Sequence, residues 1–535
     1  MRDADRLAAM FPTRRTFLKQ LGLGAGAIVL AASLDRRAFA ATRGLPRSTP
    51  EAEGVSSPAI EAFLDALAQS KYEFHSIVIA RHGRVIAEGW WAPYAAESPH
   101  TMYSMSKSFT STAVGLAVAE GKLSVEDKVT SFFPDDLPRE ISDNLAALQV
   151  KHLLTMSVGN EHEPTYDMVE QQNWVRAFLA APITHAPGSV FLYNSAATYM
   201  CSAIVQRVTG QKVIDYLTPK LFTPLSIEGM TWETCPRGIN TGGWGLSIQT
   251  EGLAKFGQLY LQKGMWNGME MIPAAWVEEA TTKHIQQPDP AKPSRPHEDN
   301  DWLQGYGYQF WRCRHNAFRG DGAFGQFTIV LPEQDAVIAI TGESSNLQGE
   351  LDLVWEHLLP AMQDGKLPAD AVAQTRLREK LAALALPPPA GPLSSPVTGH
   401  ITGKTFRLNA NDLGLQSVLF DFEKSSVHCT FRTGQDAYAI SSGLGAWEHG
   451  ETALPGTPPR LISGGAPPAG TRHKVAATGI WKDDQTWEML WRYYETPHHD
   501  TVTCHFDDDK VTVTFQTSTN RGKDKRPVLQ GQVVS

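Results

Sequence analysis

The sequence has few cysteines and only a small excess of acidic over basic residues. Its five cysteines are scattered and contain no Cys-x-x-Cys pair, which disfavours a zinc site or a disulfide framework and favours buried thiols. Cys429 and Cys504 could meet across neighbouring strands, a pairing that the sequence leaves open. With 48 basic and 57 acidic residues the net charge is −9, which argues against a nucleic-acid-binding protein. A hydrophobic content of 42% over 535 residues excludes a disordered or fibrous chain.

Only one apolar run is long enough to be considered as a membrane-spanning segment, and it lies near the N-terminus. Leu21–Leu34 is too short and too rich in glycine for a stable span. A twin-arginine pattern, Thr13–Lys19, precedes it, and the small-x-small sequence Ala38-Phe39-Ala40 follows. We expect residues 1–40 to be a twin-arginine signal peptide cleaved after Ala40, rather than a plain N-terminal helix. The mature chain would then be periplasmic or secreted, without an integral membrane span.

The rest of the chain is predicted to form two bodies joined by a proline-rich linker. Residues 41–365 mix strand and helix signals, with a hairpin over Phe74–Trp91, a helix over Ser104–Glu120 and two strands over Phe327–Thr341. This order predicts an α+β domain, a mainly antiparallel sheet flanked by helices.

The second body differs in its hydrophobic pattern. Residues 366–396 predict a helix, Asp370–Leu386, followed by a linker at Pro387–Pro392. Residues 397–535 alternate apolar and polar side chains and predict a small all-β domain, a sandwich or partial barrel. The predicted strands are Ser417–Phe422, Val427–Thr433, Thr486–Tyr494, Thr501–Phe506 and Lys510–Thr517.

A Ser-x-x-Lys pair, Ser104 and Lys107, lies at the start of the predicted helix. Residues three apart share one helix face, so the lysine amine lies within reach of the serine hydroxyl and, if neutral, would take its proton. Because lysine titrates near about 10.4, this role requires burial and a positive neighbour, and the helix N-terminus supplies part of that field. The pattern is common on solvated helices, but Phe109–Ala119 is almost uncharged, which favours a buried lysine.

Two further stretches carry candidate site residues. Pro187–Ser195 contains Tyr193, whose hydroxyl could relay a proton to a leaving group, although a core tyrosine after a Pro-Gly turn is the alternative. Gly320–Gln326 has the G-x-G-x-x-G spacing of a dinucleotide site, but it opens a strand instead of a helix, which excludes that interpretation. Glycines there would let a strand edge approach a substrate, with one backbone N–H completing an oxyanion hole.

Together these stretches resemble the serine β-lactamase and penicillin-recognising superfamily, in its class C-like esterase and peptidase branch. The resemblance covers nearly all of the first body, because further segments match in the same order: Gly121–Asp127, Val150–Gly159, Gly243–Ser247 and Leu253–Tyr260. It implies a β-lactamase/transpeptidase-like fold, in which an all-helical subdomain accompanies the α+β sheet.

The resemblance also implies roles for individual residues. Ser104 falls on the acylated nucleophile, Lys107 on its helix partner and Tyr193 on the tyrosine of the Y-x-N element. The N–H groups of Ser104 and Ala323 would hold the oxyanion.

Two positions depart from the family pattern. Ser195 stands where the Y-x-N element has asparagine, and Gly320-Asp321-Gly322 stands where K-T-G or H-x-G is usual. We expect Ser195, Asp321 and Gly322 to contact the substrate or the oxyanion. The loss of an amide and of a cation weakens the case for β-lactam hydrolysis and favours the branch of carboxylesterases and 6-aminohexanoate-dimer hydrolases.

We therefore expect a secreted serine hydrolase that cleaves a small-molecule ester or amide without a metal or cofactor. The alternatives are a D-amino-acid peptidase or β-lactamase, and a penicillin-binding-like sensor without turnover. No G-x-S-x-G element is present, which disfavours an α/β-hydrolase. The loops Asn160–Trp174 and Gln286–Trp302 would set the substrate.

Two features of the second body, a pair of adjacent histidines and a group of three tryptophans, are predicted to be structural. His498-His499-Asp500 lacks a third spaced metal ligand and is predicted to be a solvated turn. Trp481, Trp487 and Trp491 are predicted to be core residues, although they could line a sugar or peptide groove.

Overall fold

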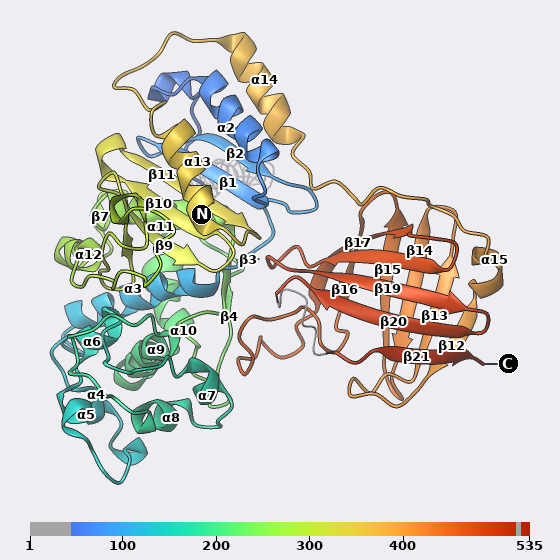
Figure 1. The fold of residues 1–535 in the computed structure, drawn as a ribbon. Helices are drawn as coiled ribbons and strands as arrows, with labels where there is room; N and C mark the ends of the chain where they lie inside the picture. Colours follow the sequence, from blue (N-terminus) through green and yellow to red (C-terminus); the bar gives the residue numbers. More distant parts are fainter. Residues whose placement is uncertain (1–43, 520–525, 535) are drawn as a thin grey trace, which may run out of the picture. The chain divides into compact units, whose positions relative to one another are not determined.

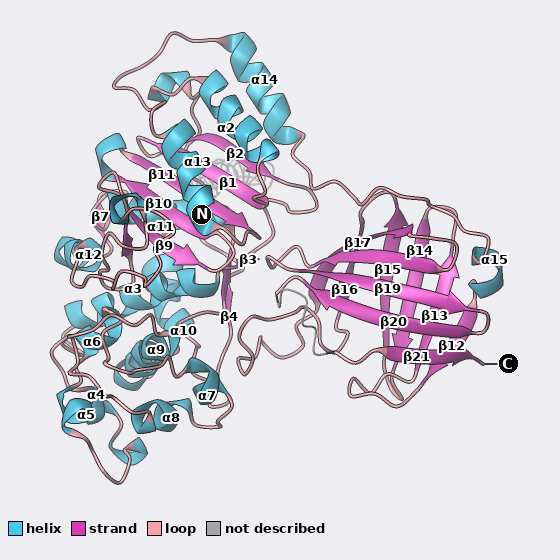
Figure 2. Ribbon diagram, viewed as in Figure 1, coloured by secondary structure: helices cyan, strands magenta, loops and turns pink. Residues whose placement is uncertain are grey.

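The computed structural model describes residues 44–519 and 526–534, so the predicted signal peptide lies outside the described part. Within it, helices and strands alternate up to about residue 382, and the remainder is almost entirely β. The predicted α+β class and the all-β C-terminal domain are both confirmed (Figures 1 and 2). All five cysteines are buried free thiols, as expected from their scatter, and Cys429 and Cys504 are not bridged.

The first part is built on a six-stranded sheet with the order β2-β1-β11-β10-β9-β8. Every neighbouring pair is antiparallel, as predicted. The predicted hairpin forms β1 and β2, and its turn places His82 and Gly83 at φ 50° and 71°. The strands are β1 Phe74–Arg81, β2 Arg84–Trp90, β8 Trp311–Arg312, β9 Phe318–Gly322, β10 Gln326–Leu331 and β11 Ala336–Gly342.

Helices cover both faces of this sheet. One face packs against α2 (Ser57–Gln69), α13 (Leu347–Leu353) and α14 (Ala371–Ala382), which together form one apolar core with alternate residues of the strands. Helix α11 (Thr250–Leu261) packs on the opposite face, beside β10 and β11. The predicted helix over Asp370–Leu386 is therefore present but ends four residues early.

A helical region is inserted between β2 and β8 (Figure 1). Its central pair is α3 (Ser106–Ala119) and α9 (Ser195–Thr209), which pack against each other and are buried on nearly all sides. The surrounding helices are α4 Val129–Phe132, α5 Asp143–Ala147, α6 Val150–Leu154, α7 Thr165–Val169, α8 Trp174–Ala180, α10 Val213–Leu217 and α12 Ala274–Thr281. Short strands complete this region: β3 His100–Thr101, β4 Thr231–Trp232, β5 Leu246–Ile248, β6 Met265–Trp266 and β7 Met269–Glu270.

The C-terminal domain is a ten-stranded sheet in which β15 also pairs with β17, so that the sheet closes into a barrel. Its interior contains Trp481, Trp487 and Trp491, which confirms their core assignment. The short helix α15 (Thr398–Ile401) precedes it. The strands are β12 Lys404–Leu408, β13 Ser417–Phe422, β14 Ser426–Arg432, β15 Ala437–Leu444, β16 Glu448–Thr452, β17 His473–Trp481, β18 Thr486–Arg492, β19 His499–Asp507, β20 Lys510–Thr517 and β21 Leu529–Val533.

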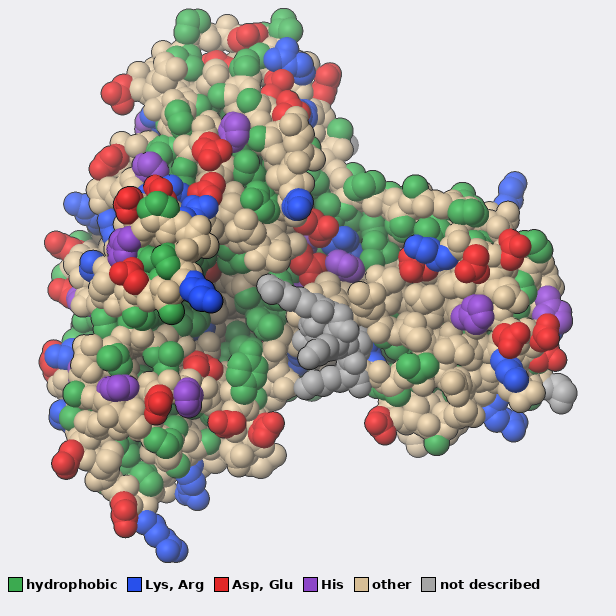
Figure 3. Space-filling view, viewed as in Figure 1, with side chains coloured by type: hydrophobic (Ala, Val, Ile, Leu, Met, Phe, Trp, Pro, Cys, Tyr) green, Lys and Arg blue, Asp and Glu red, His purple; other side chains and the backbone are tan. Residues whose placement is uncertain are grey.

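The surface carries charges of both signs. On the face shown in Figure 3, basic and acidic side chains are interspersed. Among residues 44–519 and 526–534, no helix is both long and apolar enough to cross a bilayer.

Candidate active site

The nucleophile candidate and its lysine lie side by side. Ser104 belongs to a 3-10 turn, Tyr103–Met105, which we call the nucleophile turn, and Lys107 lies in the first turn of α3. Lys107 Nζ is 3.0 Å from Ser104 Oγ. The amine also donates to Ser195 Oγ at 3.0 Å and to the Gly243 carbonyl at 2.7 Å. These three oxygens fix the nitrogen next to the serine hydroxyl.

Lys107 is fully enclosed, and this enclosure sets its protonation. Its side chain is 1% exposed, and burial lowers the pKa of Lys107 from 10.5 to about 7. The nearby carboxylates of Glu163 and Asp321 oppose this shift and favour the charged amine. The sequence-based expectation of a positive neighbour therefore needs correction: burial is the cause, and the side-chain charges that act on this amine are negative.

Tyr193 closes the group on the other side. Lys107 Nζ lies 4.9 Å from the centre of the Tyr193 ring, and the ring stacks on Trp311 at 5.6 Å. Burial raises the pKa of the Tyr193 phenol above its ordinary value, although a hydrogen bond with Ser104 opposes the rise. The phenol is therefore protonated at neutral pH and lies in contact with the serine hydroxyl.

Ser195 takes its position from the start of α9. Asn194 caps this helix by accepting a hydrogen bond from the Ala197 N–H at 2.9 Å. The Ser195 N–H donates to Glu163 Oε1 at 2.9 Å, while its hydroxyl contacts Lys107. Glu163 lies in the predicted loop Asn160–Trp174, so this loop reaches the start of α9 through its carboxylate.

The glycines of β9 allow a close approach of this strand to the nucleophile turn. A Cβ on Gly322 would lie 2.2 Å from the Met102 carbonyl, and one on Gly320 would lie 2.3 Å from Met105 Sδ. These glycines therefore let β9 pack directly on the nucleophile turn and its preceding residue. Ala323 follows directly after β9, so this packing holds its neighbour Gly322 against the Met102 carbonyl, two residues before Ser104.

The turn after β9 is held by several hydrogen bonds. Gln326 Nε2 donates to the carbonyls of Ala323 and Gly342, and the Ser344 N–H donates to the Phe324 carbonyl at 3.0 Å. Phe324 itself has a φ of 69°, in the left-handed region that bulky residues rarely adopt.

Sequence reasoning missed Arg319, which lies on the same strand as Asp321. Arg319 is buried, its Nε donates to Asp321 Oδ2 at 2.9 Å, and its guanidinium lies 4.3 Å from the Trp302 ring centre. Burial raises the pKa of Asp321 and Arg319 opposes that rise. Asp321, which follows the position where the family pattern has a cation, is thus paired with Arg319, two residues upstream. Because alternate residues of a strand share a face, the Arg-Gly-Asp spacing was a signal that could have revealed the pair.

The predicted solvated turn at His498 is wrong. The His498 side chain is 1% exposed, its Nε2 is hydrogen-bonded to Tyr103 Oη, and its Nδ1 lies 2.8 Å from Glu343 Oε1. Within the described ranges, no group of three or more His, Cys, Asp or Glu side chains is arranged to hold a metal ion.

Comparison with known proteins decides the family. The sequence profile of the family described as beta-lactamase matches residues 62–358, more than half of the chain. The chain belongs to the β-lactamase family. The family resemblance and the β-lactamase/transpeptidase-like fold are thereby confirmed.

Curated relatives of this β-lactamase-family chain include two named hydrolases. The 6-aminohexanoate-dimer hydrolase of Paenarthrobacter ureafaciens is 27% identical over 38% of this chain and 56% of its own length. The esterase EstB of Burkholderia gladioli is 25% identical over 37% of this chain and 54% of its own length. The chain thus spans little more than half the length of these relatives.

Solved structures also match. The octameric penicillin-binding protein homologue from Pyrococcus abyssi is 16% identical, with coverage of 89% of this chain and 99% of that chain and a TM-score of 0.45.

Proposed function

We propose that this protein is a serine hydrolase that cleaves a carboxylic ester or small amide through an acyl-enzyme on Ser104. The contact between Lys107 Nζ and Ser104 Oγ at 3.0 Å carries this proposal, because burial also lowers the pKa of that amine to about 7. A neutral amine keeps two N–H donors for Ser195 and Gly243 and turns its lone pair toward the serine O–H. The serine can then lose its proton as it attacks.

The remaining groups supply the other parts of acyl transfer. Ser104 Oγ bonds to the substrate carbonyl carbon, and the N–H groups of Ser104 and Ala323 donate to the resulting oxyanion. The proton passes through Lys107 and Tyr193 to the leaving alcohol or amine, because the phenol is protonated at neutral pH and contacts Ser104. Water then attacks the acyl carbon by the reverse route and frees Ser104.

The substrate class is supported by the relatives and by the charges of the site. One relative is named a 6-aminohexanoate-dimer hydrolase and another an esterase. Asp321 and Glu163 place negative charge beside Lys107, which disfavours the carboxylate of a penicillin. A D-amino-acid peptidase or β-lactamase is the second candidate, and nitrocefin hydrolysis without ester hydrolysis would favour it. A sensor without turnover would instead show a labelling burst and no steady-state rate.

Replacement of the nucleophile is the direct test. Ser104→Ala should abolish hydrolysis of a short-chain p-nitrophenyl ester and covalent labelling by an active-site-directed phosphonate. Ser111→Ala is the matched control on the adjoining helix, because Ser111 Oγ is buried and makes no hydrogen bond. Labelling that persists in Ser104→Ala would overturn the assignment.

Replacement of the base tests the second role. Lys107→Met should lose activity by at least about a hundredfold while the protein stays folded, because a general base typically contributes 10²–10⁴-fold. Ester turnover and circular dichroism measure the two effects. Full activity of Lys107→Met would exclude the amine as the base.

We further propose that residues 1–40 are an export signal and that the chain divides into domains at 41–365 and 397–535, joined by 366–396. N-terminal sequencing of protein recovered from the periplasm or medium tests the signal and should begin at Ala41. A mature chain that retains Met1 would contradict it.

A further inference from the structure

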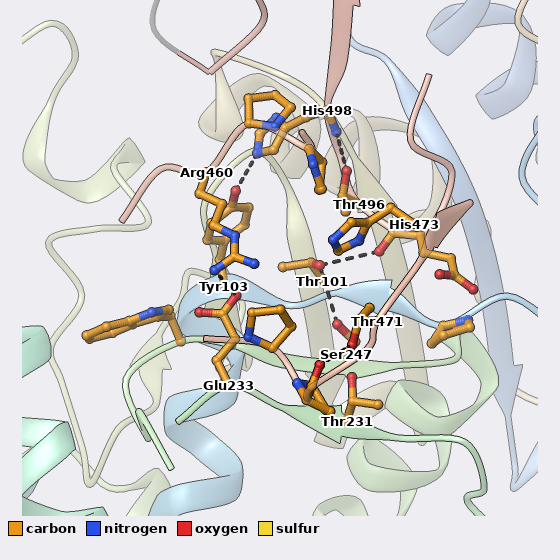
Figure 4. A pocket seen from close by; sticks show the side chains of 18 of the residues that line it. Thr101, Tyr103, Thr231, Glu233, Ser247, Arg460, Thr471, His473, Thr496 and His498 are labelled. Carbon is orange, nitrogen blue, oxygen red and sulfur yellow. Dashed lines mark hydrogen bonds and ion pairs between the residues drawn. The ribbon is translucent and has the colours of Figure 1, made fainter. Parts of the chain in front are cut away.

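A loop of the C-terminal domain reaches the nucleophile turn. This loop, residues 493–498 between β18 and β19, accepts a hydrogen bond from the Thr101 N–H at the Glu495 carbonyl, at 3.0 Å. Tyr94 Oη donates to the Thr496 carbonyl at 3.1 Å. The third contact is the hydrogen bond between His498 and Tyr103, the residue immediately before Ser104 (Figure 4). The loop is therefore bonded both to the segment before the nucleophile turn and to the first residue of that turn.

The His498 ring touches both flanks of the proposed oxyanion hole. Tyr103 precedes Ser104, and Phe324 follows Ala323, the two residues whose N–H groups would hold the oxyanion. The centre of the His498 ring lies 4.8 Å from that of Phe324, edge to face, and 5.6 Å from that of Tyr103. Tyr103 and Phe324 also contact each other, with ring centres 5.5 Å apart. One imidazole thus packs against the neighbours of both donors.

These two neighbours have a backbone conformation that needs external support. Tyr103 has a φ of 46° and Phe324 a φ of 69°, both in the left-handed region. Aromatic residues rarely adopt this region, and such conformations persist only when surrounding contacts enforce them. The Ser104 N–H lies in the peptide that follows Tyr103, and Ala323 directly precedes Phe324, so a shift of either left-handed residue would displace the chain segment that carries a proposed donor. The contact that they share is His498.

His498 is itself held in one orientation by Glu343, the residue after β11. His498 Nδ1 lies 2.8 Å from Glu343 Oε1, and His499 Nδ1 lies 2.8 Å from the other carboxylate oxygen. Burial alone would raise the pKa of Glu343, but the hydrogen bonds from both histidines hold that pKa well below its usual range. The carboxylate is therefore ionised and accepts a hydrogen bond from Nδ1–H of His498. This tautomer leaves Nε2 to accept a hydrogen bond from the Tyr103 O–H.

We propose that His498 is a positioning residue, through which the C-terminal domain fixes the two donors of the oxyanion hole. This inference rests on the proposed acyl-enzyme function. It assigns the barrel a part in the reaction through a side chain that bonds Tyr103, the neighbour of the nucleophile, and not the nucleophile itself. A small displacement of the donors would weaken transition-state binding more than substrate binding, because the oxyanion forms only during the reaction.

Four variants test this role in the full-length protein. His498→Ala removes the ring, His498→Gln restores an acceptor for Tyr103, and Tyr103→Phe removes only the hydroxyl. His499→Gln is the matched control, because His499 bonds the same Glu343 carboxylate from a position that is 28% exposed and contacts neither Tyr103 nor Phe324 in the structure. For each we would measure kcat and KM with a p-nitrophenyl ester, the phosphonate labelling rate and the melting temperature.

The expected pattern separates positioning from stability. His498→Ala and Tyr103→Phe should lower kcat and the labelling rate roughly tenfold to a hundredfold, with KM within about twofold. His498→Gln should recover part of the loss, and His499→Gln should stay within about twofold of wild type. Unchanged kcat in both His498→Ala and Tyr103→Phe, or an equal loss in His499→Gln, would overturn the proposal. Wild-type protein that is not labelled at Ser104 would overturn the proposed function as well.

Discussion

At the scale of single residues, the reactivity of the site depends on how far Lys107 is removed from water. The amine is enclosed among the first turns of α3 and α9 and the Gly243 carbonyl, and burial brings its pKa to about 7. Below that value the amine carries its proton and cannot accept one from Ser104. The rate should therefore rise as the pH increases through about 7. A kcat/KM profile with a neutral p-nitrophenyl ester measures this, and a profile that is flat from pH 6 to 9 would contradict it.

Glu163 should move this profile in a known direction. Its carboxylate stabilises the charged form of Lys107, so it opposes the lowering of the pKa by burial. Glu163→Gln keeps an oxygen that can accept from the Ser195 N–H and removes the charge. The acid limb should therefore shift to lower pH, and the ratio of activity at pH 6 to that at pH 8 should increase. Glu161→Gln, exposed on the same loop, is the control and should leave the limb in place. A shift to higher pH would refute the electrostatic argument.

At the scale of elements, the parts of the site that could be predicted are those with a local pattern. The Phe74–Trp91 hairpin follows from β-branched runs around a two-residue turn, and the Ser104–Lys107 contact follows from helical spacing. The pairing of Arg319 with Asp321 is also encoded locally, because alternate residues of a strand share a face. The role of His498 was not predictable, because its partners Tyr103 and Glu343 are 395 and 155 residues away in sequence. Such contacts depend on how whole elements pack.

The packing of β9 on the nucleophile turn leads to a prediction for Gly322. An added Cβ would meet the Met102 carbonyl at 2.2 Å, and a backbone atom cannot rotate aside as a side chain can. Gly322→Ala should therefore push β9 away from Ser104, at a cost of about 1–3 kcal/mol in stability and most of the activity. Gly450→Ala in β16 is the matched strand control, since nothing lies within 4 Å of its added Cβ. Thermal unfolding and ester turnover measure both, and equal behaviour of the two variants would refute the steric argument.

At the scale of the whole molecule, the first part and the barrel are joined by a half-buried charge pair as well as by the 493–498 loop. Arg492, at the end of β18, donates to Glu73 just before β1, with Nη1 2.7 Å from Oε1. The Arg492 side chain is 5% exposed, so water could solvate its guanidinium only poorly if the carboxylate were absent. Burial would raise the pKa of Glu73, but His75 and Arg492 outweigh it and bring the value to about 2. The interface is therefore stabilised by a charge pair that persists down to acidic pH.

Breaking this pair should be costly and its cost should depend on pH. Arg492→Met should lose about 3 kcal/mol near pH 7, since removal of one partner leaves a poorly solvated charge. Arg376→Met is the matched control, because the Arg376 side chain is 55% exposed where it pairs with Glu61, and a small change or none is expected. The folded pKa of Glu73 lies below its ordinary 4.5, so the stability it provides is complete above about 4.5 and is lost as the pH falls toward 2. The difference in melting temperature between wild type and Arg492→Met should therefore shrink over that window. A difference that grows as the pH falls, or an equal loss in Arg376→Met, would show that the pair does not stabilise the interface in its ionised form.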